Sequence, residues 1–347
     1  MNRLFACLIT LCLASCLTPM HAASINGQPY VPLMDWARAN GLKCSWLKWG
    51  EAMAVTNRAT RLVFCRNSRM AEVNGVNVAL SFPVAIDRGA PYLAQLDLNT
   101  AIRPLIYPPR AGARRITTIC IDPGHGGKDT GNRTFWHSEK TYTLALALEL
   151  RDQLRKAGFN VILTRSSDTH VELPARPGLA NQRGADLFLS LHFNATRIGR
   201  DQVQGPETYC ITPVGASSSN AQGEGANHGP TPANRVEQQS VLLAYQVEKA
   251  LVRNLRVPDR GVRRARYWVL CAAAMPAILV ESGYMSHPAE SKKIYTAAYR
   301  QQVAQAIVKG ILAYQQLTSP PPPPPRPTVP ATSNRPTVRV QPSTNWP

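Results

Sequence analysis

Short, largely apolar runs alternate with longer stretches of helical periodicity between residues 116 and 317. The runs 116–121, 160–164 and 187–191 are typical of strands buried within a sheet. Between the first two, residues 139–156 carry apolar side chains at helical spacing, and Gly158 follows them. Strand and helix in alternation predict an α/β fold, a layered domain with a central mixed, largely parallel sheet flanked by helices.

The same alternation continues to the end of this region. A helix is predicted over 173–183, and Pro177 is expected to break or restart it. Residues 207–211 are predicted to form a strand at an edge of the sheet. The remaining predicted elements are helices at 235–255 and 299–317 and strands at 267–270 and 277–280.

A smaller unit precedes this domain. In residues 24–108 short strand-like runs alternate with turn residues, and one helix is predicted over 33–40, closed by Gly41. The pattern predicts a small α+β module, joined to the larger domain at 116–317 by a linker at 109–115. The segments VNGVNVAL and APYLAQLDL weakly resemble the copper-amine-oxidase-like N-terminal module of cell-surface proteins. That resemblance implies a stalk or binding unit and no copper chemistry.

Both ends of the chain have a composition of their own. Residues 1–23 resemble a secretory signal, because the apolar run 4–17 is too short to span a bilayer. Cleavage at a lipobox ending in Cys16 would leave a lipid anchor on the membrane, whereas ordinary cleavage near Ala23 would not. Either route predicts export to the periplasm or cell envelope. Residues 318–347 are rich in proline and are predicted to form a disordered tail.

Charge and cysteine content narrow the partners and the metal chemistry. The net charge of +18 favours acidic partners: nucleic acid, an anionic membrane face or a cell-wall polymer. Five cysteines follow the signal and show no C-x-x-C spacing, which argues against a cysteine-based zinc site. Export permits disulfides, and Cys44 with Cys65 is the predicted pair; buried thiols are the alternative.

Four side chains suited to metal or proton chemistry stand at strand ends or a helix start. His125 follows the first strand in the glycine-rich turn 122–127, and His192 follows the strand 187–191. Glu281 ends the strand 277–280, and Glu139 begins a helix. Such groups gather at the carboxyl ends of strands in an open α/β sheet. A catalytic zinc site needs three His or Glu ligands, an open position and a nearby acid/base group.

Simpler explanations exist for each residue alone. A histidine after a strand is often a surface residue, and a glutamate at a helix start is often a cap. A glycine-rich turn can also bind phosphate. The turn 124–128 lacks the required G-x-x-x-x-G-K-[ST] spacing, because Asp129 follows the lysine. The joint placement of the four residues favours a metal site.

Several blocks, in order, resemble the zinc-dependent N-acetylmuramoyl-L-alanine amidases of bacterial cell walls. They are ICIDPGHGGKDTGN, SEKTYTLALALELRDQL, VILTRSSD, LPARPGLANQRGADLFLSLHFNA and AILVESGYMSHPAES. The resemblance implies one Zn²⁺ bound by His125, Glu139 and His192, and Glu281 as the catalytic base. It implies hydrolysis of the amide between N-acetylmuramic acid and L-alanine in peptidoglycan, for wall remodelling or daughter-cell separation. Peptidoglycan, and no nucleic acid, is the expected partner.

Departures from the family pattern and rival functions remain. Trp136 and His137 stand where a small segment is common, the loop 212–233 is long, and His287 stands where Asn is usual. Asp122 and Asn194 are expected to orient a ligand or contact substrate. The rival functions are a non-catalytic peptidoglycan-binding protein and a zinc endopeptidase of wall crosslinks. The sequence names no activator protein.

Overall fold

The computed structural model describes residues 23–109, 115–134, 136–220 and 229–319. Residues 1–22 of the predicted signal, with its lipobox Cys16, and residues 320–347 of the predicted tail lie outside these residues. The central part of the predicted loop 212–233 lies outside them as well. No helix among the described residues is long and apolar enough to cross a membrane.

A mixed sheet forms the centre of the C-terminal part. Its first four strands run parallel, in the order β13-β10-β14-β17. β15 is antiparallel to β17, and β16 is parallel to β15. The bounds are β10 (Thr118–Pro123), β13 (Asn160–Leu163), β14 (Leu187–Asn194), β15 (Glu207–Ile211), β16 (Val262–Ala265) and β17 (Ala277–Tyr284). The predicted α/β class with a largely parallel sheet is confirmed.

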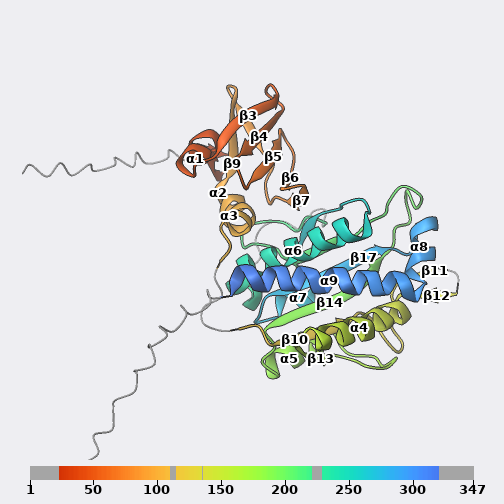
Figure 1. The fold of residues 1–347 in the computed structure, drawn as a ribbon. Coiled ribbons are helices and arrows are strands. Elements are labelled where there is room, and N and C mark those ends of the chain that lie inside the picture. The colour runs from red at the N-terminus through yellow and green to blue at the C-terminus, as the bar shows by residue number, and fades with distance from the viewer. Residues whose placement is uncertain (1–22, 110–114, 135, 221–228, 320–347) are drawn as a thin grey trace, which may run out of the picture.

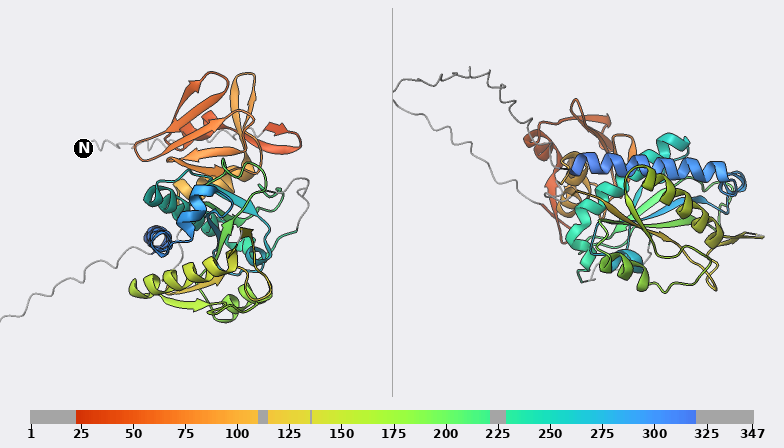
Figure 2. Two further views of the ribbon diagram at one scale, coloured as in Figure 1. Left: turned by 90° about the vertical axis from the view of Figure 1, so that its right-hand side faces the viewer. Right: turned by 60° about the horizontal axis from the view of Figure 1, so that its bottom comes forward.

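Helices cover both faces of this sheet (Figures 1 and 2). One face packs on the long helices α4 (Glu139–Lys156), α6 (Glu237–Leu255) and α9 (Ala297–Thr318), and Ile119, Leu189 and Val280 point into this core. The other face packs on α5 (Ala175–Gln182) and α7 (Trp268–Cys271), with Cys120, Phe188 and Leu279 in a second core. Because side chains alternate along a strand, His192 shares a face with Phe188, and Glu281 shares it with Leu279.

The N-terminal part extends the same sheet. Five of its strands continue from β16 in the order β7-β6-β5-β4-β3, and Val78 pairs in parallel with Val262. A second sheet has the order β1-β2-β9-β8. The strands are β1 (Ala23–Ile25), β2 (Gln28–Pro32), β3 (Lys43–Lys48), β4 (Ala52–Thr56), β5 (Arg61–Cys65), β6 (Met70–Val73), β7 (Val76–Ala79), β8 (Ala85–Asp87) and β9 (Ala90–Ala94). Its helical segments are α1 (Leu33–Ala39), α2 (Gln95–Asp97), a π-helical turn (Leu98–Ile102) and α3 (Arg103–Ile106).

Hydrogen bonds and a shared core join the two parts. Tyr245 of α6 donates to the carbonyl of Val73 at 3.0 Å, and the backbone N–H of Asn77 donates to Asp259 at 2.6 Å. β15 is an interior strand of this sheet, with β17 on one side and β16 on the other. The prediction of an edge strand at 207–211 was therefore wrong.

Three other local predictions need correction. Residues 268–271 form the short helix α7, and the strand lies earlier, at Val262–Ala265. Arg263 and Arg264 interrupt the apolar pattern by which a buried strand is recognised in a sequence. Arg264 is nevertheless buried, and it donates to the carbonyls of Thr100 and Ile211. Pro177 does not break α5, because it is the third residue, where no helical N–H bond is lost. Cys44 and Cys65 are not disulfide-bonded; they lie on β3 and β5, on either side of β4.

The remaining elements are a hairpin and two short helical segments. The hairpin β11 (Arg133–Thr134) and β12 (His137–Ser138) directly precedes α4. The short helix α8 (Pro288–Ile294) follows β17, and a 3-10 turn (Pro232–Val236) precedes α6.

Candidate active site

The turn after β10 places His125. The residue has a left-handed backbone, with φ of 63°, and Gly126 and Gly127 continue the turn at positive φ. Its Nδ1 lies 2.9 Å from a carboxylate oxygen of Asp129, which leaves Nε2 facing Glu139 at 3.1 Å. Burial alone would lower the pKa of His125, but the hydrogen bonds and charges of Glu139 and Asp129 outweigh burial and raise it.

Glu139 is the first residue of α4, and its side chain is 1% exposed. One carboxylate oxygen contacts His192 Nδ1 at 3.0 Å and accepts from the N–H of Phe193 at 3.1 Å. The other accepts at 2.9 Å from both the backbone N–H and the side-chain amide of Asn132. Burial would raise the pKa of Glu139, but hydrogen bonds from the two histidines outweigh it and hold the pKa well below its usual value. The buried carboxylate is therefore kept ionised.

His192 lies on β14, and its ring meets that of His125 edge-on, with 4.9 Å between the centroids. Gly124 packs against the His192 ring so closely that a Cβ there would lie 2.3 Å from Cε1. One ligand atom each from His125, Glu139 and His192 can be chosen within 4.8 Å of one another. The structure thus brings together the three residues predicted to bind metal.

Glu281 stands beside this cluster on β17, paired in register with His192. Its Oε2 is buried and has no hydrogen-bond partner among the described residues. Burial, and then the negative charges of Glu139 and Glu207, raise the pKa of Glu281 well above its usual value. A buried carboxylate oxygen without a partner points to a ligand or water in the cavity.

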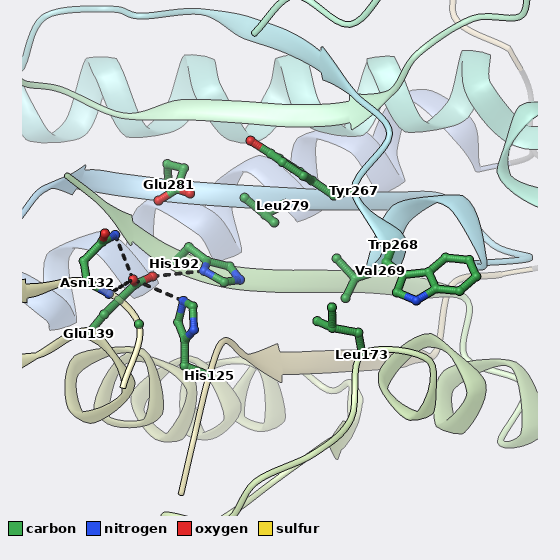
Figure 3. Close-up of a pocket in the computed structure, with 11 residues that line it drawn as sticks. His125, Asn132, Glu139, Leu173, His192, Tyr267, Trp268, Val269, Leu279 and Glu281 are labelled. Atoms are coloured by element: carbon green, nitrogen blue, oxygen red, sulfur yellow. Dashed lines mark hydrogen bonds and ion pairs between the residues drawn. The ribbon is translucent and has the colours of Figure 1, made fainter. Parts of the chain in front are cut away.

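The three candidate metal ligands and Glu281 all line a cavity of about 370 Å³ (Figure 3). His125, Glu139, His192 and Glu281 line one end, together with Asn132. Apolar side chains line the other end: Leu173, Val269, Leu279 and the indole of Trp268. Tyr267 points its hydroxyl toward Glu281 between the two ends.

Asp122 and Asn194 lie near the cluster and contact other groups. Asp122 is fully buried and pairs with Arg176 at 2.8 Å. Arg176 in turn donates to the carbonyl of His125 at 3.0 Å, so Asp122 supports the turn that carries this histidine. The Asn194 amide donates to Glu207 at 2.7 Å and to the hydroxyl of Tyr284 at 3.2 Å.

Two residues that the sequence reasoning missed contact the cluster directly. Asp129 holds His125, and Asn132 holds Glu139 and also donates to the carbonyl of Phe193 at 3.0 Å. Both lie in the block already singled out, four and seven residues after His125. His137, one of the departures from the family pattern, stacks on Tyr295 with 3.7 Å between ring centroids and hydrogen-bonds to Tyr142.

Comparison with known proteins identifies the family of this chain. The sequence profile described as N-acetylmuramoyl-L-alanine amidase matches residues 119–313, more than half of the chain. The chain belongs to the N-acetylmuramoyl-L-alanine amidase family. This confirms the predicted enzyme class, a hydrolase that cuts an amide of cell-wall peptidoglycan. The match does not extend to residues 24–108, so the resemblance of that module to copper-amine-oxidase-like modules stays a prediction.

Individual relatives agree with the family profile. The chain is 31% identical over 229 residues to amidase AmiA of Escherichia coli K12, covering 59% of this chain and 78% of AmiA. It is 34% identical over 197 residues to amidase LytC of Bacillus subtilis 168, covering 57% of this chain and 35% of LytC. Among solved structures, amidase AmiC2 of Nostoc punctiforme is 32% identical, with a TM-score of 0.49 over 58% of this chain and 97% of AmiC2.

Proposed function

We propose that this protein is a zinc-dependent amidase that cleaves the bond between the lactyl group of N-acetylmuramic acid and the L-alanine of the stem peptide. His125, Glu139 and His192 bind one Zn²⁺, and Glu281 is the general base. The observation that carries the proposal is the cluster of three ligand atoms within 4.8 Å, beside a buried carboxylate that has an unpartnered oxygen.

The donor set fits zinc. Two imidazole nitrogens and one carboxylate are a set found in catalytic zinc sites, where a fourth position stays open for water. Asp129 contacts the Nδ1 of His125, which fixes the tautomer that presents Nε2 to the metal. Zn²⁺ held there would supply Lewis-acid chemistry, acidifying a water molecule and polarising a carbonyl oxygen.

The chain's own residues handle the proton. Glu281 accepts the proton of the attacking water and returns it to the nitrogen of the leaving L-alanine. Its raised pKa makes it a stronger proton acceptor than an exposed carboxylate. The second carboxylate, Glu139, is held ionised and is assigned to the metal, and Asn132 and the N–H of Phe193 orient it, so it is unsuited to that exchange. The two carboxylates therefore have separate roles.

The domain limits and the cell location belong to the same proposal. Residues 116–317 form the catalytic domain, residues 24–108 a stalk or wall-binding module, and residues 318–347 a spacer or tail. Residues 1–23 direct export to the cell envelope, with Cys16 as a lipid anchor where the lipobox is used. Export would place the enzyme in the compartment that holds its substrate.

The Glu281→Gln variant tests the mechanism. Glutamine keeps the shape of the side chain but cannot accept a proton, so we expect bound zinc to stay and turnover to fall by about 100-fold or more. Metal analysis and mass spectrometry of digested wall sacculi measure the two effects, and Glu51→Gln on the N-terminal module is the control. Full turnover in zinc-loaded Glu281→Gln protein would remove Glu281 from the mechanism. A new peptide amine without a muramyl lactyl carboxylate would indicate an endopeptidase instead.

A further inference from the structure

The cavity beside the metal ligands has two unlike halves. His125, Glu139, His192 and Glu281 make one half polar. In the other half, Leu173 and Trp268 stand at the surface, and their side chains are 51% and 56% exposed. Val269 and Leu279 lie beside them and are buried (Figure 3). The exposed indole of Trp268 lies beside the metal ligands. Binding of a ligand over this indole would remove apolar surface from water, which favours binding.

The apolar half is built from segments distant in sequence. Leu173 comes from the loop before α5, Trp268 and Val269 from α7, and Leu279 from β17. α5 and α7 pack on the same face of the sheet, with Ala180, Val269 and Leu270 in one core. The indole is therefore carried on packed elements, which lowers the entropy lost when a ligand is bound.

The charges of the residues that line the cavity indicate which part of the substrate the apolar half binds. The described residues that line the cavity include no lysine or arginine, and two carboxylates, Glu139 and Glu281, lie within it. The stem peptide carries carboxylates, which would lose water in the apolar half without a lysine or arginine as counterion. The sugar side of the scissile amide is uncharged and offers the apolar C–H face of a pyranose ring.

The opposite end of the site carries positive charges, which are complementary to the carboxylates of the stem peptide. Arg133 on β11 and Arg197 in the loop after β14 are exposed. Thr134, next to Arg133, donates to the carbonyl of Met285, and the backbone N–H of Thr196, next to Arg197, donates to the hydroxyl of Ser286. Both arginines therefore stand beyond the carboxyl end of β17, whereas Leu279 lies two residues before Glu281 on the same strand. Acidic groups are favoured at that end.

We propose that Leu173, Trp268 and Val269 bind a pyranose ring of the glycan strand, and that the stem peptide leaves the metal site toward the carboxyl ends of β14 and β17. This orientation rests on the proposed function, because it places the scissile amide at the metal ligands. It makes Trp268 the residue that selects glycan-linked substrate over free stem peptide.

Binding to a catalytically inactive protein tests the orientation. In zinc-loaded Glu281→Gln protein, calorimetry would measure three ligands: a disaccharide tetrapeptide, the free tetrapeptide, and the disaccharide alone. We expect Trp268→Ala to weaken both glycan-containing ligands by about tenfold and to leave the free tetrapeptide unchanged. Trp268→Phe should restore most of the affinity, because an aromatic face remains. Trp49→Ala, which removes an indole 74% exposed on the N-terminal module, is the matched control.

The outcomes separate this proposal from the mechanism. Equal losses for the glycan ligands and the free tetrapeptide would assign the apolar half to the peptide and overturn the orientation. Unchanged affinity for all three ligands would overturn the role of Trp268. Zinc content and circular dichroism of each variant confirm that the metal site and fold are intact. Failure of the proposed function would appear elsewhere, as wild-type protein that binds these ligands but does not cut the muropeptide.

Discussion

Replacing Gly124 by alanine should displace the metal ligand His192 without any ligand residue being substituted. An added Cβ would lie 2.3 Å from Cε1, 2.5 Å from Nε2 and 2.8 Å from Nδ1 of His192. Ordinary contact begins at 3.4 Å, so the ring must retreat by about 1.1 Å. Metal–ligand distances tolerate only about 0.2 Å. We therefore expect the zinc affinity of Gly124→Ala protein to fall by about 100-fold or more. This loss is larger than the one usually caused by removing a residue that orients a metal ligand, because here the ligand itself is displaced.

Competition with a chromophoric chelator measures the affinity, and circular dichroism checks the fold. Gly178→Ala is the matched control, because this glycine also has an ordinary φ and a Cβ there would meet nothing within 4 Å. Since Gly178 lies within α5, alanine there should stabilise the protein by about 0.5–1 kcal/mol and leave zinc binding unchanged.

A second variant isolates the contact between Gly124 and the ring. In a His192→Ala background the ring is gone, so Gly124→Ala should cost no further zinc affinity. The reasoning would be refuted by folded Gly124→Ala protein that binds zinc within about threefold of wild type. An equal loss in the His192→Ala background would refute it as well, because the effect would then be a general distortion of the turn.

Two further predictions concern the support of the site and of the module junction. Asp129→Asn should lower zinc affinity by about tenfold, the low end of the usual range, because the Asp129 carboxylate is 44% exposed; unchanged affinity in chelator competition would show that the contact does not orient His125. Burial raises the pKa of Glu248 well above 4.5, so the native state holds this proton more tightly than the unfolded chain. Glu248 therefore stabilises the folded protein fully at pH values below its pKa in the unfolded chain. This stabilisation is lost as the pH rises toward the raised pKa of Glu248 in the folded protein. Glu248→Gln cannot titrate, so its thermal midpoint relative to wild type should rise between pH 5 and pH 8; a constant difference would contradict the assignment.

Elements with a strong local period could be predicted from the sequence. Residues 139–156 were expected to be helical and form α4 with those bounds, because apolar side chains at helical spacing and a following glycine specify a helix locally. The strands that carry His192 and Glu281 could be located from apolar runs that stop at a polar residue, although β14 and β17 continue past the predicted ends to Asn194 and Tyr284. Parallel strands bring their carboxyl ends together, so three distant segments could be expected to meet at one site.

Contacts between distant segments were decided only by the tertiary structure. β15 is interior because β16, from residues 262–265, pairs with the side that β17 leaves open, and no periodicity within 207–211 records that neighbour. The partner of His125 is Asp129 and not Asp122, because the left-handed turn carries the ring away from β10. Leu173 and Trp268 form one apolar wall although about 95 residues separate them. A local pattern shows which side chains need burial, whereas their partners depend on how the helices pack across the sheet.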